Sequence, residues 1–123
     1  MDTRSKILTL ADAASLAGPL AIVTGYFDVL RAAHIRALVE LHRRAGGAKL
    51  LAVVLPAPDE ILAQRARAEL VAALRVIDYV VIADAAEAHR LADSIEPVEI
   101  ARLEAADARR ARELKEHVHR RQT

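Results

Sequence analysis

Three apolar runs, each followed by a segment with helical spacing, organise most of this chain. Residues 20–24, 50–55 and 79–82 are almost continuously apolar, which is typical of strands buried on both faces. Apolar residues recur every three or four positions over residues 33–44, which predicts a helix that ends before Gly46. A second helix is predicted from Asp59, as its N-cap, to about Arg75, and a third over residues 85–93. The residues of the second helix expected to face the core are Leu62, Leu70, Ala73 and Leu74.

Shorter elements flank this repeating unit. Residues 6–9 predict a short strand or an extended lead-in, and residues 11–17 predict a brief helix that stops at Gly18. Residues 98–100 predict a fourth strand. Residues from about 105 to 121 predict a charged helix with a narrow apolar stripe.

The alternation of strands and helices predicts an α/β fold, a three-layer Rossmann-like arrangement in which helices cover both faces of a parallel sheet. We expect residues 1–123 to form a single domain, because the length suits one core and no linker-like segment interrupts it. Ligands bind such sheets beyond the carboxyl ends of the strands, where the strand order reverses. The end of the first buried run, at Thr24 and Gly25, is therefore the first place to look for a site.

Composition narrows the range of partners. The 18 Lys and Arg residues nearly balance the 17 Asp and Glu residues, so no overall field favours nucleic acid or an anionic membrane. Only Tyr26, Phe27 and Tyr79 are aromatic, which leaves few side chains on which bases could stack. The chain shows no signal-like leader, no segment long enough to span a bilayer and no cysteine. These features predict a cytoplasmic protein.

Candidate chemistry lies in residues 24–34. Gly25 would let a backbone or a phosphate approach without a side chain in the way. Arg31 and His34 are three residues apart where a helix begins, so both side chains can project from one face of its first turn. The free N–H groups and the dipole of a helix N-terminus also favour anions. Together these features predict a phosphate site.

This segment resembles the signature of the cytidylyltransferase-like nucleotidyltransferases. The family motif is Gly-x-Phe-Asp-x-x-His-x-Gly-His, and the chain reads Gly25-Tyr26-Phe27-Asp28-Val29-Leu30-Arg31-Ala32-Ala33-His34. A second family segment, Arg…Leu-x-x-Val-Asp-x-Val-Val, is similar to Arg67…Leu74-Arg75-Val76-Ile77-Asp78-Tyr79-Val80-Val81, with the same spacing between Arg and Asp. Residues 6–10 and the short helix after them resemble the start of the adenylyltransferase domain of the bacterial heptose-phosphate bifunctional enzyme. The resemblance covers roughly residues 6–97 and extends to glycerol-phosphate cytidylyltransferase-like proteins.

The resemblance implies transfer of CMP or AMP from CTP or ATP to a small phosphorylated acceptor, with release of pyrophosphate. It makes His34 and Arg31 the catalytic candidates, with Arg31 in the place of the first motif histidine. It implies Mg²⁺ as a cofactor and, since the family commonly dimerises, a homodimer; we predict no metal ligands from the protein itself. The implied nucleotide-binding residues are Thr24, Gly25, Tyr26, Phe27, Asp28, Ala33 and Arg67.

Several departures from the family pattern weaken this site. Arg31 is permanently charged, unlike histidine, and Ala33 carries a methyl group where the motif has glycine. The family's basic loop before Arg67 is missing, and so is its late Ser/Thr-rich phosphate-binding motif. Loss of one electrostatic donor typically lowers a rate by about 10²–10³-fold. Three functions therefore stay open: nucleotidyl transfer, binding of nucleotide or phosphate without turnover, and a structural or dimeric interaction role.

The candidates near the motif also have structural interpretations. His34 could be a capping side chain or an internally bonded one. Asp28 could be the N-cap of a helix that begins near Leu30. We expect Phe27 to lie in the core.

The same holds for the charged residues further along the chain. Arg67 could form an ion pair with Glu60 or Asp78 instead of contacting a ligand. Asp84 is expected to cap the helix that follows it. Glu104 belongs to a run of alternating charges that is typical of a solvated helix.

Overall fold

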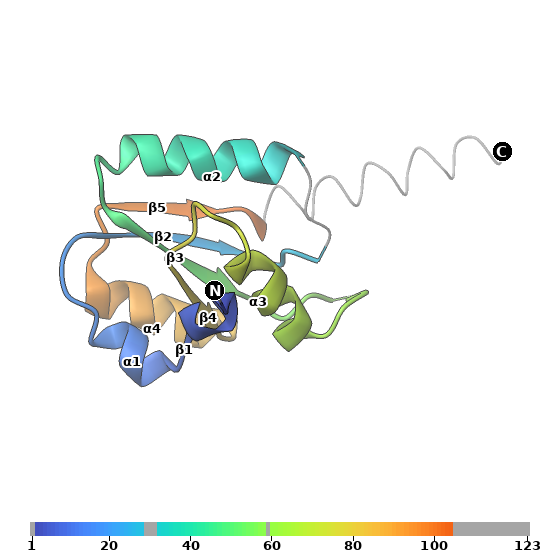
Figure 1. Ribbon diagram of the computed structural model, residues 1–123. Coiled ribbons are helices and arrows are strands. Elements are labelled where there is room, and N and C mark those ends of the chain that lie inside the picture. Colours follow the sequence, from blue (N-terminus) through green and yellow to red (C-terminus); the bar gives the residue numbers. More distant parts are fainter. Residues whose placement is uncertain (1, 29–31, 59, 105–123) are drawn as a thin grey trace, which may run out of the picture.

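The computed structural model describes residues 2–28, 32–58 and 60–104, and the strands in these segments form one sheet (Figure 1). They lie in the order β1-β4-β3-β2-β5, and every neighbouring pair is parallel. This arrangement confirms the predicted α/β class with a parallel sheet. The strands are β1 (Ile7–Leu8), β2 (Leu20–Gly25), β3 (Lys49–Val54), β4 (Tyr79–Ile82) and β5 (Glu99–Arg102).

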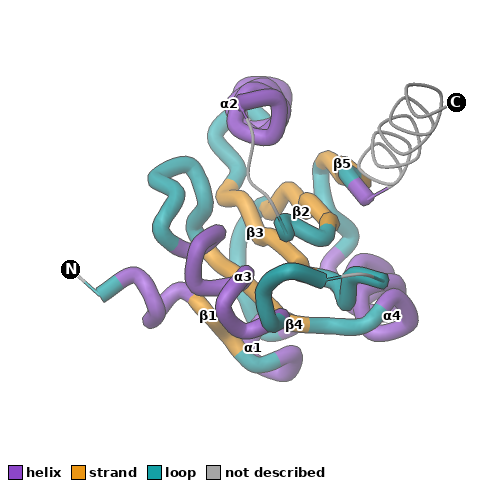
Figure 2. Tube along the Cα trace, turned by 90° about the vertical axis from the view of Figure 1, so that its right-hand side faces the viewer, coloured by secondary structure: helices purple, strands orange, loops and turns teal. Residues whose placement is uncertain are grey.

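Helices cover both faces of the sheet, as predicted. Helices α2 (Ala32–Arg44) and α3 (Gln64–Ala72) pack on one face, and α1 (Leu10–Ala14) and α4 (Ala85–Ile95) pack on the other (Figures 1 and 2). A short 3₁₀ helix, Thr3–Lys6, precedes β1. Among the described segments, no helix is long and apolar enough to cross a membrane.

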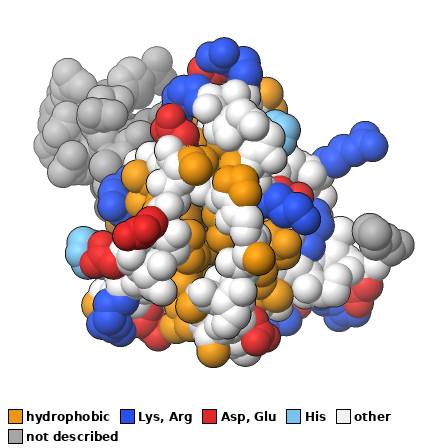
Figure 3. Space-filling model, turned by 90° about the vertical axis from the view of Figure 1, so that its left-hand side faces the viewer, with side chains coloured by type: hydrophobic (Ala, Val, Ile, Leu, Met, Phe, Trp, Pro, Cys, Tyr) orange, Lys and Arg blue, Asp and Glu red, His pale blue; other side chains and the backbone are white. Residues whose placement is uncertain are grey.

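The strand order reverses at β2. From β2 the chain moves outwards through β3 to β4, and α4 then returns it to β5 on the other side of β2. Figure 2 looks onto the edge at which the strands end, and Figure 3 shows the opposite edge, where apolar side chains gather among separated charges. We name the first of these the carboxyl edge and define it as residues 24–28, 55–58, 83–84 and 103–104. The prediction that Thr24 and Gly25 lie where the order reverses is confirmed.

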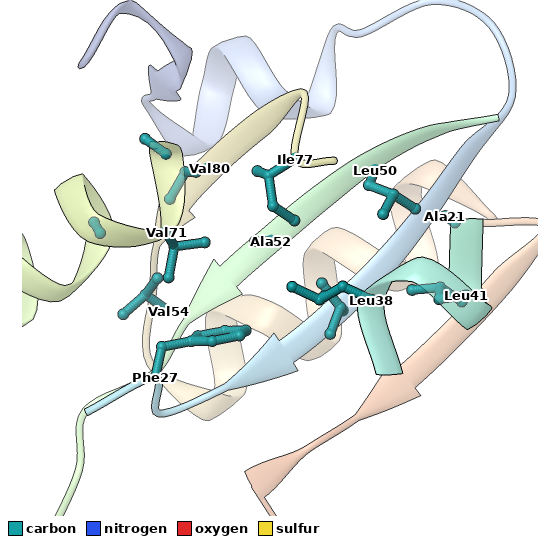
Figure 4. Close-up of a cluster of buried hydrophobic side chains, with 13 residues drawn as sticks. Ala21, Phe27, Leu38, Leu41, Leu50, Ala52, Val54, Val71, Ile77 and Val80 are labelled. Carbon is teal, nitrogen blue, oxygen red and sulfur yellow. The ribbon is translucent and has the colours of Figure 1, made fainter. Parts of the chain in front are cut away.

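Consecutive residues of the central strands supply two separate cores. Val54 and Leu50 of β3 face α2 and α3, where Phe27, Leu38 and Val71 complete one buried cluster (Figure 4). Leu51 and Val53 of β3 face α1 and α4 and join a second buried cluster. Because both faces are covered, the strands read as continuous apolar runs rather than as an alternating pattern.

Two predicted helices have different bounds in the structure. Helix α1, predicted over residues 11–17, is shorter and ends at Ala14. Helix α3 begins at Gln64 and ends at Ala72, whereas the sequence predicted a helix from Asp59 to about Arg75. Asp59 itself lies outside the described residues. Residues 60–62 stay in a loop because the N–H groups of Ile61 and Leu62 donate to a distant carboxylate.

The later start changes which face of α3 is buried. The buried positions are Arg67, Ala68, Val71 and Ala72. Leu70, which was expected in the core, is 47% exposed, and Ala73 is exposed as well. The helix predicted at about 105–121 lies outside the described residues.

Candidate functional site

The turn that follows β2 is shaped by a close contact between Gly25 and Phe27. Phe27 has a φ of 53°, in the left-handed region, so the chain turns sharply and the ring is buried with 1% exposed. A Cβ atom on Gly25 would lie 3.1 Å from Cε2 of this ring. Gly25 therefore makes room for the packed ring of Phe27, and the prediction that Phe27 lies in the core is confirmed.

Arg67 is fully buried and connects three segments of the chain. Its Nη1 donates to the carbonyl oxygens of Tyr26 and Leu55, at 2.6 and 2.7 Å. Its Nε donates to the carbonyl of Leu62 at 3.1 Å, and its Nη2 donates to Glu60 Oε2 at 2.8 Å. The ion pair with Glu60, one of the two structural interpretations, is present. The guanidinium thus ties the loops after β2 and β3 to α3.

Asp28, in the loop after β2, also binds the loop after β3. Its carboxylate accepts from the N–H of Ile61, at 2.9 and 3.1 Å to the two oxygens, and from the N–H of Leu62 at 3.0 Å. Sequence reasoning expected this side chain to cap a helix near Leu30, and residues 29–31 lie outside the described residues. Both carboxylate oxygens are engaged in fixing the loop after β3.

His34 lies in the first described turn of α2 and is buried. Only 5% of its surface is exposed, and its ring centroid is 6.5 Å from that of Phe27, with the planes tilted by 48°. Ala33 beside it is half-buried, and Arg31 lies outside the described residues. The imidazole therefore sits in a packed environment next to the turn, and its action on a phosphate stays a prediction.

Thr24 and Glu104 meet where β2 and β5 end. Thr24 is 2% exposed, and its Oγ1 donates to the Glu104 carboxylate, at 2.8 and 3.0 Å to the two oxygens. The N–H of Leu103 donates to the carbonyl of Thr24 at 2.8 Å, which continues the ladder past β5. Glu104 was expected on a solvated helix; it is helical but half-buried rather than solvated, because its carboxylate meets Thr24, and the helix predicted after it lies outside the described residues. Its position just after the fourth predicted strand was the signal that could have indicated this.

Two further side chains fix the ends of β3 and β4. The side-chain amide of Gln64 donates to the carbonyls of Val54 and Ala83, at 2.9 and 3.3 Å. Asp84 caps α4 in a capping box with Glu87, as its predicted structural role required. The carboxyl edge is therefore held by side-chain bonds at every strand end from β2 to β5.

Most of the predicted site residues lie together at this edge. Thr24, Gly25, Tyr26, Phe27, Asp28, Ala33, His34 and Arg67 belong to β2, the turn after it, the start of α2 and the buried face of α3. Among the described residues, no group of three or more His, Cys, Asp or Glu side chains could hold a metal ion. In the second half of α2, a hydrogen bond from Arg43 lowers the pKa of Glu40.

The comparisons with known proteins concern the fold. No family model matches the sequence, and no curated protein matches it. The structure is similar to the crystal structure of the lipopolysaccharide core biosynthesis protein from Thermoplasma volcanium GSS1, with a TM-score of 0.59 and 24% sequence identity. The match covers 67% of this chain and 71% of that one. At this identity the likeness shows a related α/β fold.

Replacing the buried guanidinium is expected to destabilise the protein. We expect Arg67→Met to lower the free energy of unfolding by about 3 kcal/mol or more, because three carbonyls and a carboxylate lose their donor. Arg67→Lys should also destabilise, since an ammonium group cannot reproduce the planar fork. Urea denaturation measures both effects.

Arg65→Met is the matched control on the same helix. Arg65 pairs with Glu69 at the surface, where its side chain is 60% exposed, so we expect a loss below about 1 kcal/mol. Equal losses for the two methionine variants would contradict the assigned role of Arg67.

Proposed function

We propose that this protein binds a nucleoside triphosphate, CTP or ATP, at the carboxyl edge and does not transfer its nucleotidyl group at an appreciable rate. The observation that carries the proposal is a turn at the reversal of strand order whose candidate side chains are buried or already bonded within the protein. The turn after β2 and the start of α2 lie where the strand order reverses, while His34 is buried and Asp28 and Arg67 are bonded inside the protein.

The position of α2 supports binding of an anion. This helix has 13 described residues and begins at Ala32, a few residues beyond the end of β2. Free N–H groups at a helix N-terminus favour phosphate, and ligands of open parallel sheets lie at this edge. Gly25, Phe27 and Asp28, which resemble the start of the nucleotidyltransferase signature, lie at the end of β2 and just after it.

The burial of His34 and the internal hydrogen bonds of Arg67 support the proposed absence of turnover. Transfer of a nucleotidyl group depends on donors that contact the phosphate oxygens as charge develops. His34 is 5% exposed, and Arg67 is fully buried with bonds to three carbonyls and a carboxylate. Each missing donor lowers the rate by about 10²–10³-fold, so several together remove useful catalysis.

The residues at the edge do not fit a protein-bound Mg²⁺. This ion is usually held by one or two carboxylates together with substrate phosphates. Both oxygens of Asp28 accept backbone N–H bonds, and both oxygens of Glu104 accept the Thr24 hydroxyl. In the part of the chain that the structure describes, no group of three or more His, Cys, Asp or Glu side chains could hold a metal ion, so we assign no step to the Mg²⁺ that the family resemblance implies.

Titration with nucleotides tests the proposal directly. We expect CTP or ATP to raise the melting temperature and to give a saturable calorimetric binding curve, because a ligand that binds only the folded state stabilises it. Incubation of the protein with either nucleotide and a panel of sugar and polyol phosphates should release no pyrophosphate above background.

Each half of this result can fail separately. An unchanged melting curve with every nucleotide would contradict binding. Release of pyrophosphate with any pair would contradict the absence of turnover and would establish nucleotidyl transfer instead.

Restoring two motif residues is expected to strengthen binding. In Arg31→His with Ala33→Gly, the motif regains its histidine and the glycine that lets a nucleotide lie against the backbone. We expect the affinity for the bound nucleotide to rise by about threefold to tenfold, as one additional hydrogen bond would produce. Calorimetry of the double variant measures this change.

Arg31→His with Ala32→Gly is the matched control. It keeps Arg31→His and moves only the glycine, by one position. The cost in helix propensity is similar, about 1 kcal/mol for glycine. Because both double variants carry Arg31→His, equal binding by the two would show that glycine at position 33 does not determine the affinity.

A further inference from the structure

The ends of β2 and β5 place a carboxylate at the point where the strand order reverses. Thr24 lies beside Arg102 in the register of these two strands. Glu104 follows two residues later, after β5 has ended, and its carboxylate reaches the Thr24 hydroxyl. This is the position at which ligands of open parallel sheets bind.

The charge of Glu104 is not neutralised by the described part of the chain. No described Lys, Arg or His nitrogen forms an ion pair with its half-buried carboxylate, although five such pairs are present elsewhere in those residues. An ionised carboxylate has about four acceptor positions, and the Thr24 hydroxyl approaches one side of each oxygen. Acceptor capacity therefore remains for a second hydroxyl.

We infer that Glu104 is a specificity-determining residue that directs a sugar hydroxyl of the ligand, and not its phosphates, to the ends of β2 and β5. The inference rests on the proposed nucleotide binding, because it concerns the same edge. A carboxylate repels a phosphate at close range and accepts strong hydrogen bonds from hydroxyl groups. The phosphates then lie toward the N-terminus of α2, and the ribose lies toward β5.

The contact between Thr24 and Glu104 already shows this chemistry within the protein. A hydroxyl donates to the carboxylate at distances of 2.8 and 3.0 Å, at a position where the surrounding backbone is fixed by the strand ladder. A ribose hydroxyl would add a second donor of the same kind.

Matched pairs of ligands test the inference. Calorimetry compares CTP and ATP with their 2′,3′-dideoxy forms on the wild type and on Glu104→Ala. We expect the wild type to prefer the ribonucleotide by about tenfold, the factor supplied by one charge-assisted hydrogen bond, and Glu104→Ala to reduce this preference to less than about twofold.

A second arm tests the repulsion of phosphate and uses inorganic triphosphate as the probe. Glu104→Gln removes the charge but keeps an oxygen that can accept from Thr24, so the fold should be preserved. We expect this variant to bind triphosphate about threefold to tenfold more tightly than the wild type. Glu99→Gln is the control, because Glu99 is also half-buried and lies at the opposite end of β5, beyond about one Debye length.

The outcomes separate the inference from the proposed function. Equal binding of ribo and dideoxy nucleotides by the wild type, with no effect of Glu104→Ala, would overturn the inference and leave nucleotide binding intact. Failure of the wild type to bind any nucleotide would overturn the proposed function and, with it, the sugar contact; tighter triphosphate binding by Glu104→Gln in that case would support only the repulsion of phosphate by Glu104. If neither the wild type nor either Glu104 variant binds nucleotide or triphosphate, both are overturned.

Discussion

The buried guanidinium of Arg67 fixes the relative positions of the segments that form the carboxyl edge. Four hydrogen bonds connect it to the loops after β2 and β3 and to the residues before α3. A charge with no exposed surface is tolerated only when such bonds replace its hydration. The loop after β3 is held a second time, because Asp28 accepts the N–H groups of Ile61 and Leu62. Together these contacts make the edge a preformed surface.

Under the proposed function, the same contacts explain how the turn after β2 keeps its shape without catalysing a transfer. Gly25 accommodates the ring of Phe27, which is itself packed in the core with Leu38 and Val54. These roles stabilise the turn whether or not a nucleotide reacts there. Selection for folding alone would keep Gly25, Phe27 and the buried Arg67. The resemblance to the nucleotidyltransferase signature and its departures are therefore compatible with one account.

Strands could be predicted from the sequence better than side-chain roles, for a physical reason. Burial on both faces leaves a local, continuous apolar pattern, and the bounds of β4 match the prediction at both ends. The start of α3 depends on bonds to Asp28, more than 30 residues away. The contact of Arg67 with Tyr26 spans 41 residues, and that of Thr24 with Glu104 spans 80. Such contacts leave no local pattern, so the bond between Glu104 and Thr24 and the buried face of α3 were not predicted.

The measurement that tests the account most directly is amide chemical-shift mapping of the ¹⁵N-labelled protein during titration with CTP and with ATP. The account predicts that the perturbed amides concentrate at residues 24–28, the start of α2 and residues 102–104, with saturation at a common ligand concentration. The groove between α1 and α4, lined by Leu10, Ala14 and Leu91 among others, serves as an internal reference that should not respond. Perturbations confined to that groove, or none at high nucleotide concentration, would contradict the account.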